Sequence, residues 1–354
     1  MEGDEGSSSK FTIGNTAQER SLSYVPDCYK IPSSGRPSLV HEIANVPGID
    51  LGGLRKGAVQ RAKVVRDIAN VCRHIGFFQI MNHGISESVM EGALEVASEF
   101  FELPMEEKKK VMSKDVHSPV RYGTSIKDGV DKFQFWRVFL KHYAYPLSHW
   151  IHLWPLNPPS YREKMGNYCT EVRNLALELM SAMTEGLGLG STYMQDKMEE
   201  GVQVIAANCY PPCPSPEIAL GLPPHSDYSC ITIVLQSSPG LEIKDDPRDN
   251  KWRIVPQIKG ALQVHVGDHF EVLSNGLYKS VLHRATLNSD ITRVSIASLH
   301  SLGMDQKMAT ASELLDDDEH RRRYKESSFR DFLNFLSSND ITQGKSFLAT
   351  LKIS

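Results

Sequence analysis

The sequence has few cysteines and no long hydrophobic run, and both absences limit what the protein can be. Six cysteines among 354 residues are too sparse for a disulfide scaffold and suit a reducing compartment. No stretch of 18 apolar residues is present that could cross a membrane as a helix. The acidic N-terminus also lacks the apolar segment of a secretory signal. We therefore expect a cytoplasmic protein with no membrane partner.

Positive charge is not in excess either. The formal net charge is -4 at pH 7, and the sequence pI is about 6.4. Such a chain has no basic field with which to attract nucleic acid or anionic lipid. We therefore expect a small-molecule partner and no nucleic-acid partner. Separately, we expect the protein to be a monomer or a weak homodimer.

Two histidines and one aspartate have the spacing of a metal site. His225 and Asp227 are two residues apart, so they share a face in extended backbone, and residues 230–235 that follow form a β-branched strand pattern. His283 ends the segment 278–283, which we also expect to be a strand. Two histidines and a carboxylate form the facial triad that binds Fe(II) and leaves positions open. The alternative is that His-x-Asp arises by chance and that His283 is a packed residue of the core.

A second pattern begins ten residues after His283. Arg293 and Ser295 share a face of the next expected strand and can offer a guanidinium and a hydroxyl to one carboxylate. The alternative is an arginine at a strand edge that pairs with a surface acid. Its position just after a candidate iron ligand favours the carboxylate site.

Several motifs occur in the order and spacing of one enzyme family. They are the segments at 208–214 (NCYPPCP), 224–227 (PHSD), 267–268 (GD), 273–276 (LSNG), 278–285 (YKSVLHRA) and 293–295 (RVS). From about Val46 to the C-terminus the chain resembles the plant 2-oxoglutarate- and Fe(II)-dependent dioxygenases of the isopenicillin N synthase-like superfamily. The segments 136–140 (WRVFL) and 154–159 (WPLNPP) are similar to the subgroup that includes salicylate hydroxylases and flavanone 3-dioxygenase-like enzymes.

The resemblance implies a set of catalytic and cofactor-binding residues. The catalytic residues that bind Fe(II) would be His225, Asp227 and His283. The residues that bind 2-oxoglutarate, whose distal carboxylate meets the arginine, would be Arg293, Ser295, Tyr210 and Asn208. O2 would be the other co-substrate, and ascorbate is the expected reductant. The family's Asn-His-Gly motif implies that His83 is structural, whereas His265 is a strand residue that could tune the pocket.

The resemblance also implies an α+β fold with a double-stranded β-helix (jelly-roll) core, flanked by N-terminal helices and a C-terminal helix. Short strands between proline and glycine turns, recurring from near Val202 to residue 298, are typical of a jelly roll. We expect four regions: a partly disordered N-terminal arm (1–45), an N-terminal helical dioxygenase region (46–200), the Fe(II)/2-oxoglutarate jelly-roll domain (201–303) and a C-terminal helical segment (304–354). Residues 113–135 have no clear period and are the expected mobile segment over the pocket.

Four residues are candidates for the substrate pocket: Phe133, Phe139, Leu299 and Ser301. Leu299 and Ser301 stand where the anthocyanidin-forming relatives carry an aromatic and an acidic contact to a flavonoid. This departure disfavours a flavonoid polyol and favours a smaller or less polar substrate.

We interpret the chain as an Fe(II)- and 2-oxoglutarate-dependent dioxygenase that hydroxylates or desaturates a small aromatic specialised metabolite or hormone, with succinate and CO2 as co-products. Two alternatives remain open. One is a superfamily oxidase that does not consume 2-oxoglutarate, in which Arg-x-Ser holds another carboxylate. The other is a catalytically inactive jelly-roll protein that binds a ligand.

Overall fold

Two β-sheets form the centre of the protein. The computed structural model describes residues 11–38, 42–124, 133–246, 248–316, 321–339 and 346–353. Within these residues the large sheet has eight strands, in the order β2 (Gly48–Asp50), β3 (Phe77–Met81), β11 (Leu262–Val266), β8 (Ile231–Gln236), β13 (Arg293–Ser301), β6 (Val202–Tyr210), β5 (Val138–Tyr145) and β4 (Val120–Gly123). The small sheet has five, in the order β1 (Glu42–Ile43), β10 (Arg253–Ile254), β9 (Leu241–Ile243), β12 (His283–Ala285) and β7 (Leu222–His225).

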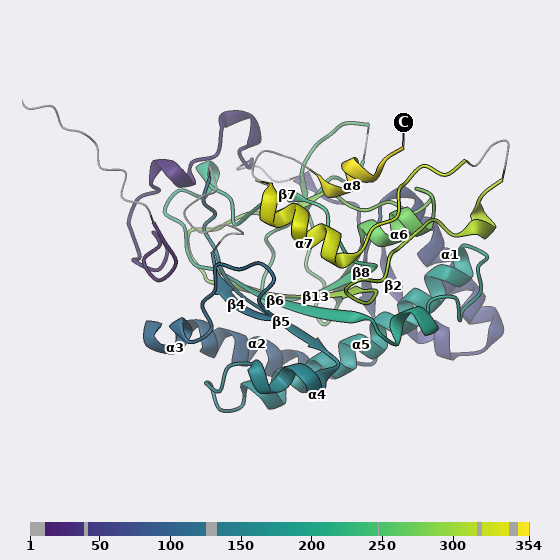
Figure 1. Cartoon of the computed structure of the whole chain (residues 1–354). Coiled ribbons are helices and arrows are strands. Elements are labelled where there is room, and N and C mark those ends of the chain that lie inside the picture. The colour runs from purple at the N-terminus through teal and green to yellow at the C-terminus, as the bar shows by residue number, and fades with distance from the viewer. Residues whose placement is uncertain are drawn as a thin grey trace, which may run out of the picture.

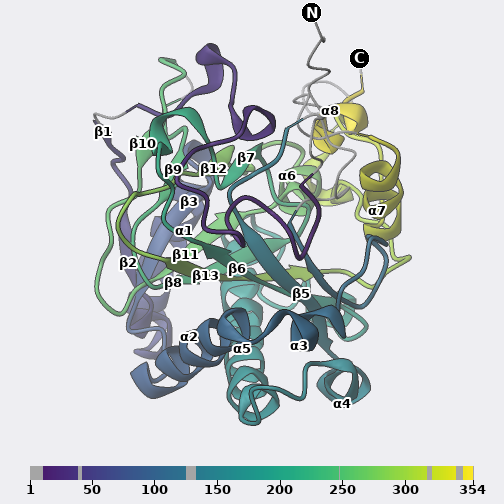
Figure 2. The ribbon, with the colours of Figure 1, turned by 90° about the vertical axis from the view of Figure 1, so that its left-hand side faces the viewer.

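The two sheets face each other, and helices cover the outside of the large one. Figures 1 and 2 show α2 (Glu87–Glu102) and α5 (Tyr161–Gly186) against one face of the large sheet, with the small sheet on the other side. The remaining helices are α1 (Ala58–His74), α3 (Met105–Lys109), α4 (Leu147–Trp150), α6 (Asp268–Leu273), α7 (Phe329–Ser338) and α8 (Phe347–Leu351). Short 3-10 helices lie at Asp27–Tyr29, Ser33–Gly35, Leu51–Arg55, Ile151–Leu153, Asp196–Met198, Pro216–Ile218 and Ser312–Leu314. This arrangement confirms the predicted jelly-roll fold.

Strand β13 has apolar side chains on the outer face of the large sheet and polar side chains on its inner face. It lies between β6 and β8 and is antiparallel to both. Val294 and Ile296 point outward into the main hydrophobic core, which α2 and α5 complete. Because side chains alternate along a strand, Arg293 and Ser295 point to the inner face, between the sheets. The sheet thus places polar residues inside while its apolar face packs on helices.

The structure corrects one local expectation, at residues 278–282, and adds detail on two others. In the N-terminal arm, Phe11 and Ala17 are buried in a cluster with Trp136. Residues 278–282 form no strand, and β12 begins at His283, where pairing with β7 and β9 starts. The segment 113–135, which we expected to be mobile, includes strand β4. Residues 125–132 of this segment lie outside the described residues.

Gly76 is required where α1 ends, and its replacement is expected to destabilise the fold. Its φ is +75°, and a Cβ there would lie 1.8 Å from the Lys279 carbonyl oxygen. We expect Gly76→Ala to lower the free energy of unfolding by about 3 kcal/mol or more, because left-handed strain and a backbone clash combine. The matched control is Gly188→Ala, where φ is +81° but nothing lies within 4 Å. Gly188→Ala should lower the free energy of unfolding by about 1 kcal/mol. Urea titration of both variants measures this free energy, and an equal loss in the two would show that the clash at Gly76 does not matter.

Among the residues that the structure describes, none of the helices combines the length and apolar character that a bilayer span needs.

Candidate active site

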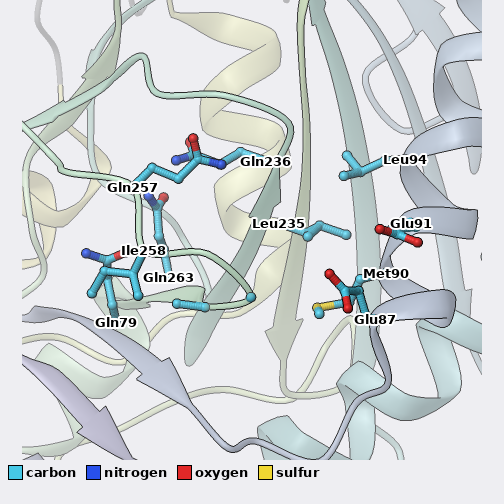
Figure 3. A pocket seen from close by; sticks show the side chains of 12 residues that line it. Gln79, Glu87, Met90, Glu91, Leu94, Leu235, Gln236, Gln257, Ile258 and Gln263 are labelled. Carbon is cyan, nitrogen blue, oxygen red and sulfur yellow. The ribbon is translucent and has the colours of Figure 1, made fainter.

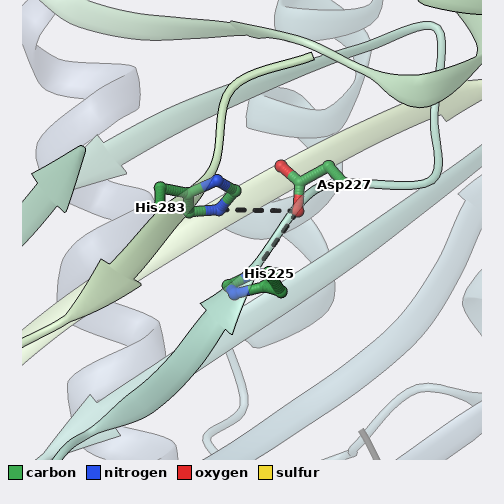
Figure 4. A group of neighbouring side chains, drawn as sticks. All are labelled: His225, Asp227 and His283. Carbon is green, nitrogen blue, oxygen red and sulfur yellow. Dashed lines mark ion pairs between the residues drawn. The ribbon is translucent and has the colours of Figure 1, made fainter. Parts of the chain in front are cut away.

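The structure brings His225, Asp227 and His283 together at one end of the small sheet. His225 is the last residue of β7 and His283 the first of β12, and the two are direct partners in the antiparallel ladder. Asp227 follows β7 by two residues and turns its carboxylate between the two imidazoles (Figure 4). Its Oδ1 lies 3.6 Å from Nε2 of each histidine, and the three candidate ligand atoms lie within 4.8 Å of one another.

Backbone carbonyls fix how each imidazole is presented. The Nδ1 of His225 lies 2.8 Å from the Pro223 oxygen, and that of His283 lies 3.1 Å from the Val281 oxygen. A carbonyl only accepts, so each Nδ1 carries the proton and each Nε2 keeps its lone pair. Burial lowers the pKa of both histidines to about 4, so both rings are neutral at neutral pH.

The carboxylate completes a donor set that suits Fe(II). Burial opposes the charge of Asp227, but the neighbouring His283 and His265 outweigh it and hold its pKa below the usual range. Two neutral imidazoles and one ionised carboxylate are the ligands of non-haem Fe(II) sites. The candidate ligand atoms lie within 4.8 Å of one another, so one ion could contact all three. The donor set therefore fits a single ion.

Asp268, at the start of α6, holds the two ligand-bearing segments together. Its carboxylate accepts from Ser226 Oγ at 3.2 Å and from Ser280 Oγ at 2.7 Å, and its N–H donates to the Asp227 carbonyl at 2.9 Å. Burial raises the pKa of Asp268 to about 7. The sequence showed this residue only as part of a motif. Its role depends on contacts that the motif does not reveal.

His265, on β11, is a neighbour of the candidate metal ligands. Its Nδ1 lies 3.4 Å from Asp227 Oδ2, which is long for a hydrogen bond. Its ring packs against His283 at 4.5 Å and against Phe77 at 4.9 Å. The residue is 1% exposed, and it borders the carboxylate oxygen that is turned away from both imidazoles. This placement supports the expectation that His265 tunes the site.

Removing the His265 imidazole is expected to weaken iron binding moderately. In His265→Leu we expect Fe(II) affinity to fall about 10-fold, because groups behind a ligating carboxylate orient it. His265→Asn should lose less, since an amide keeps a polar group on the side of Asp227 Oδ2. Anaerobic Fe(II) titration measures both. His83→Leu is the control, because His83 is a buried histidine whose Nε2 contacts the Gly260 oxygen at 3.0 Å. Equal affinities in all three variants would contradict this role.

Arg293 is buried on the inner face and keeps one nitrogen without a partner. Its Nε donates to the Ser238 oxygen at 3.0 Å and its Nη2 to Gln236 Oε1 at 2.9 Å. Its Cζ lies 4.9 Å from the centre of the Tyr210 ring, and Nη1 has no hydrogen-bond partner among the described residues. A guanidinium that is 2% exposed and keeps one nitrogen without a hydrogen-bond partner can accept an anion there. The distal carboxylate of 2-oxoglutarate is such an anion, with the buried Ser295 two residues along the strand.

Both polar atoms of the Asn208 side chain form hydrogen bonds within the protein. Its Oδ1 accepts from Arg137 Nη1 at 2.9 Å, and its Nδ2 donates to the Ala206 oxygen at 3.0 Å. Its contact with a co-substrate stays a prediction. Arg137 itself was missed from the sequence, because it lies in an aromatic segment that is typical of a packed core. Its guanidinium lies 4.8 Å from the centre of the Phe139 ring, close to the predicted pocket.

Three of the four predicted pocket residues share the inner face of the large sheet. Phe139 aligns with Asn208, the partner of Ser295, so it lies on the same face as the Arg293 site. Leu299 and Ser301 continue that face along β13, and Leu299 packs in a cluster with α7. Phe133 lies outside the sheet, against the buried cluster that contains Ile31, Phe135 and Leu220.

A separate small cavity lies between α2 and the ends of β8 and β11 (Figure 3). It measures about 120 Å³, and its polar lining includes Gln79, Gln236 and Gln263. No residue predicted for the site lines it. Gln236, which lines the cavity, also accepts from the Arg293 guanidinium through its Oε1. The cavity is too small for a drug-sized ligand.

A jelly roll that carries two histidines and a carboxylate able to hold one metal ion, together with a buried, incompletely paired arginine, is typical of the non-haem Fe(II) oxygenases. Comparison with known proteins gives the family. Residues 201–301 match the model of the 2OG-Fe(II) oxygenase superfamily, and residues 46–157 match that of the non-haem dioxygenase in morphine synthesis N-terminal region.

Relatives cover almost the whole chain. Flavanone 3-dioxygenase 3 from Oryza sativa subsp. japonica is 49% identical over 91% of this chain and 98% of its own length. The 2-oxoglutarate-dependent dioxygenase 21, chloroplastic, from the same organism is 50% identical over 87% of this chain and 91% of its own. The crystal structure of JOX2 in complex with 2OG, Fe and JA superposes with a TM-score of 0.80 at 33% identity, covering 90% of this chain and 91% of that one.

The chain belongs to the 2OG-Fe(II) oxygenase superfamily. It is an oxidoreductase that uses Fe(II), 2-oxoglutarate and O2, as the sequence led us to expect.

Proposed function

We propose that the protein hydroxylates or desaturates a small aromatic metabolite or hormone and that His225, Asp227 and His283 bind its iron. Bound Fe(II) and 2-oxoglutarate supply the oxidising chemistry, in which the co-substrate is decarboxylated to succinate and CO2. The observation that carries the proposal is the bare Nη1 of Arg293 on the inner face. It provides a buried cation for the far carboxylate of a diacid.

The protein's own contribution is to bind, orient and exclude water. The carbonyls of Pro223 and Val281 hold the two imidazoles in the tautomer that presents Nε2. Arg293, with Ser295 and Tyr210 beside it, would set the direction of 2-oxoglutarate, since a guanidinium fork fixes a carboxylate in orientation as well as position. Because these side chains are at most 4% exposed, the charges they hold are poorly screened by water.

Relatives support a small, largely apolar substrate. One is named a flavanone 3-dioxygenase, and the JOX2 structure contains JA. In this chain Leu299 and Ser301 offer neither an aromatic ring nor an acid to a flavonoid, and Leu299 is half-buried on the inner face. We therefore extend the proposal to a substrate that is smaller or less polar than a flavonoid polyol.

Succinate formation tests the proposed function. Purified protein with Fe(II), ascorbate and 2-oxoglutarate should release succinate above its substrate-free rate when a compound from a panel of phenolics, flavanones and plant hormones is added. Turnover that proceeds without 2-oxoglutarate would identify the oxidase alternative instead. A protein that binds a ligand but contains no iron would instead be the catalytically inactive jelly-roll protein. The complete triad favours the oxygenase over both.

The location and assembly of the protein are also proposals. We propose a cytosolic protein that is a monomer or a weak homodimer. One relative is named chloroplastic, so a fluorescent fusion at the C-terminus should be compared between cytosol and plastid. Sedimentation at micromolar concentration should give the mass of one chain, and a stable dimer would contradict the expected state.

A further inference from the structure

A second cavity lies between helix α5 and the segment that follows it. It measures about 620 Å³, which is the size of a site for a small organic molecule. The chain turns back along α5 through Gly188 and Gly190, whose φ values of +81° and +89° suit glycine, and residues 191–199 form the second wall. None of the residues predicted for the active site lines this cavity. Because α5 covers the face of the large sheet that is turned away from the small sheet, the cavity is separate from the candidate iron site (Figure 2).

Much of the lining of this cavity is apolar. Arg173, Leu177 and Met180 follow one another at intervals of four and three residues, so they project from one side of α5. Met194 and Met198 line the cavity from the second wall, and the three methionines are all buried. Methionine side chains are flexible and polarizable, so such a lining can adapt to apolar bodies of different shape.

Arg173 is the buried cation of this lining. It is 8% exposed, and its Nη2 donates to the Met198 carbonyl at 2.8 Å. Its Cζ lies 3.3 Å from the centre of the Tyr145 ring, whose face attracts a cation. Among the residues that the structure describes, Nη1 has no hydrogen-bond partner and the guanidinium forms no ion pair with a carboxylate. Burial lowers the pKa of Arg173, but a guanidinium stays protonated in proteins, so this charge lacks a counter-ion.

We propose that this cavity binds an organic anion with an apolar body, whose charged group pairs with Arg173. The body would lie on the leucine and methionine side chains, and the anion would supply the counter-ion of the guanidinium. Glu199 is an acid of the lining, but its side chain is exposed and forms no ion pair with Arg173. The inference goes beyond the proposed function and does not depend on it, since the cavity shares no residue with the candidate active site.

The competing role for Arg173 is structural, because its bond to the Met198 carbonyl ties the second wall to α5. A tether predicts that Arg173→Met loosens the wall and weakens charged and neutral ligands alike. An anion site predicts a loss for the charged ligand alone. Two fluorescent probes with one ring skeleton separate these roles, because 8-anilinonaphthalene-1-sulfonate carries a sulfonate and N-phenyl-1-naphthylamine lacks it.

The experiment is a fluorescence titration of the full-length protein with each probe. The protein is held anaerobic with Fe(II) and saturating 2-oxoglutarate, so that the candidate co-substrate site is filled. In Arg173→Met the affinity for the sulfonate probe should fall about 10- to 100-fold, since a charge-assisted hydrogen bond is lost. The affinity for the neutral probe should stay at the wild-type value. Arg173→Lys should keep part of the affinity for the sulfonate probe, and Glu199→Gln should raise it about 2- to 5-fold because an exposed like charge is removed.

Three further variants make the test specific to this cavity. Ser181→Phe fills the cavity from α5 and leaves Arg173 in place, so it should weaken both probes and decides the outcome should Arg173→Met unfold. Lys197→Met is the matched control, because Lys197 belongs to the same segment as the second wall but does not line the cavity. It should bind both probes as the wild type does, and so should Arg293→Met.

The inference is overturned if the sulfonate probe does not bind, or if Arg173→Met keeps its affinity or loses both probes equally. It is also overturned if Ser181→Phe leaves binding unchanged. Loss of the sulfonate probe in Arg293→Met but not in Arg173→Met would place the probe in the candidate active site and reject the inference. Binding that depends on Arg173, without succinate from any compound, would uphold the inference and reject the proposed function.

Discussion

His225→Ala and His283→Ala are each expected to lose iron and, with it, turnover. Each imidazole would supply one of three protein ligands to a single ion, and its Nε2 lies 3.6 Å from the shared Asp227 oxygen. Loss of a group behind a ligand costs about 10- to 100-fold in affinity or activity, so loss of the ligand itself should exceed about 100-fold. Metal content after dialysis against Fe(II) and the rate of succinate release measure the two effects.

The control for these variants is another buried histidine. His83→Ala removes an imidazole whose contacts are the Gly260 oxygen and the Ile85 N–H, both structural. It should bind a full equivalent of iron, although it melts at a lower temperature. Wild-type iron content and turnover in the His225→Ala variant would show that His225 is not an iron ligand.

Arg293→Met is expected to weaken 2-oxoglutarate binding by about 100-fold or more while leaving iron binding intact. Truncating one partner of a buried, hydrogen-bonded charge pair costs about 2–5 kcal/mol. The variant also frees the Ser238 oxygen and Gln236 Oε1, which now accept from the guanidinium. Titration of the anaerobic iron-loaded protein with 2-oxoglutarate measures the affinity. Raised 2-oxoglutarate should restore part of the rate, since the loss is in binding.

The matched variant is Arg293→Lys, which keeps the charge and loses the planar fork. We expect an intermediate affinity, because a lysine can pair with a carboxylate but cannot also reach both protein acceptors in the geometry of a guanidinium. Equal affinity in the wild type, Arg293→Lys and Arg293→Met would show that the distal carboxylate binds elsewhere.

The clustering of His225, Asp227 and His283 could be predicted because local rules determine much of it. His225 and Asp227 are close in the chain, and the motif spacing indicated His283 as the third member. The prediction of a strand was wrong for residues 278–282, which have strand-like side chains but form no ladder with another strand. Ser280 hydrogen-bonds to helix α6 instead, with its Oγ donating to Asp268 and its N–H to Glu271. Tertiary contacts there override the local strand propensity.

The groups that support the site could not be predicted, because each contact joins distant segments. Ser226 and Asp268 are 42 residues apart, and Arg137 and Asn208 are 71 apart. The packing of Phe11 could not be predicted for a similar reason, because its partners include Tyr29 and Trp136, which are distant in the chain.

The most direct test of the central claim is an anomalous difference map at the iron absorption edge, from crystals grown anaerobically with Fe(II) and 2-oxoglutarate. We predict a single strong peak within bonding distance of His225 Nε2, Asp227 Oδ1 and His283 Nε2. The co-substrate should extend from that peak to a carboxylate on Arg293 Nη1. Iron bound away from these three atoms, or a co-substrate that does not reach Arg293, would contradict the account.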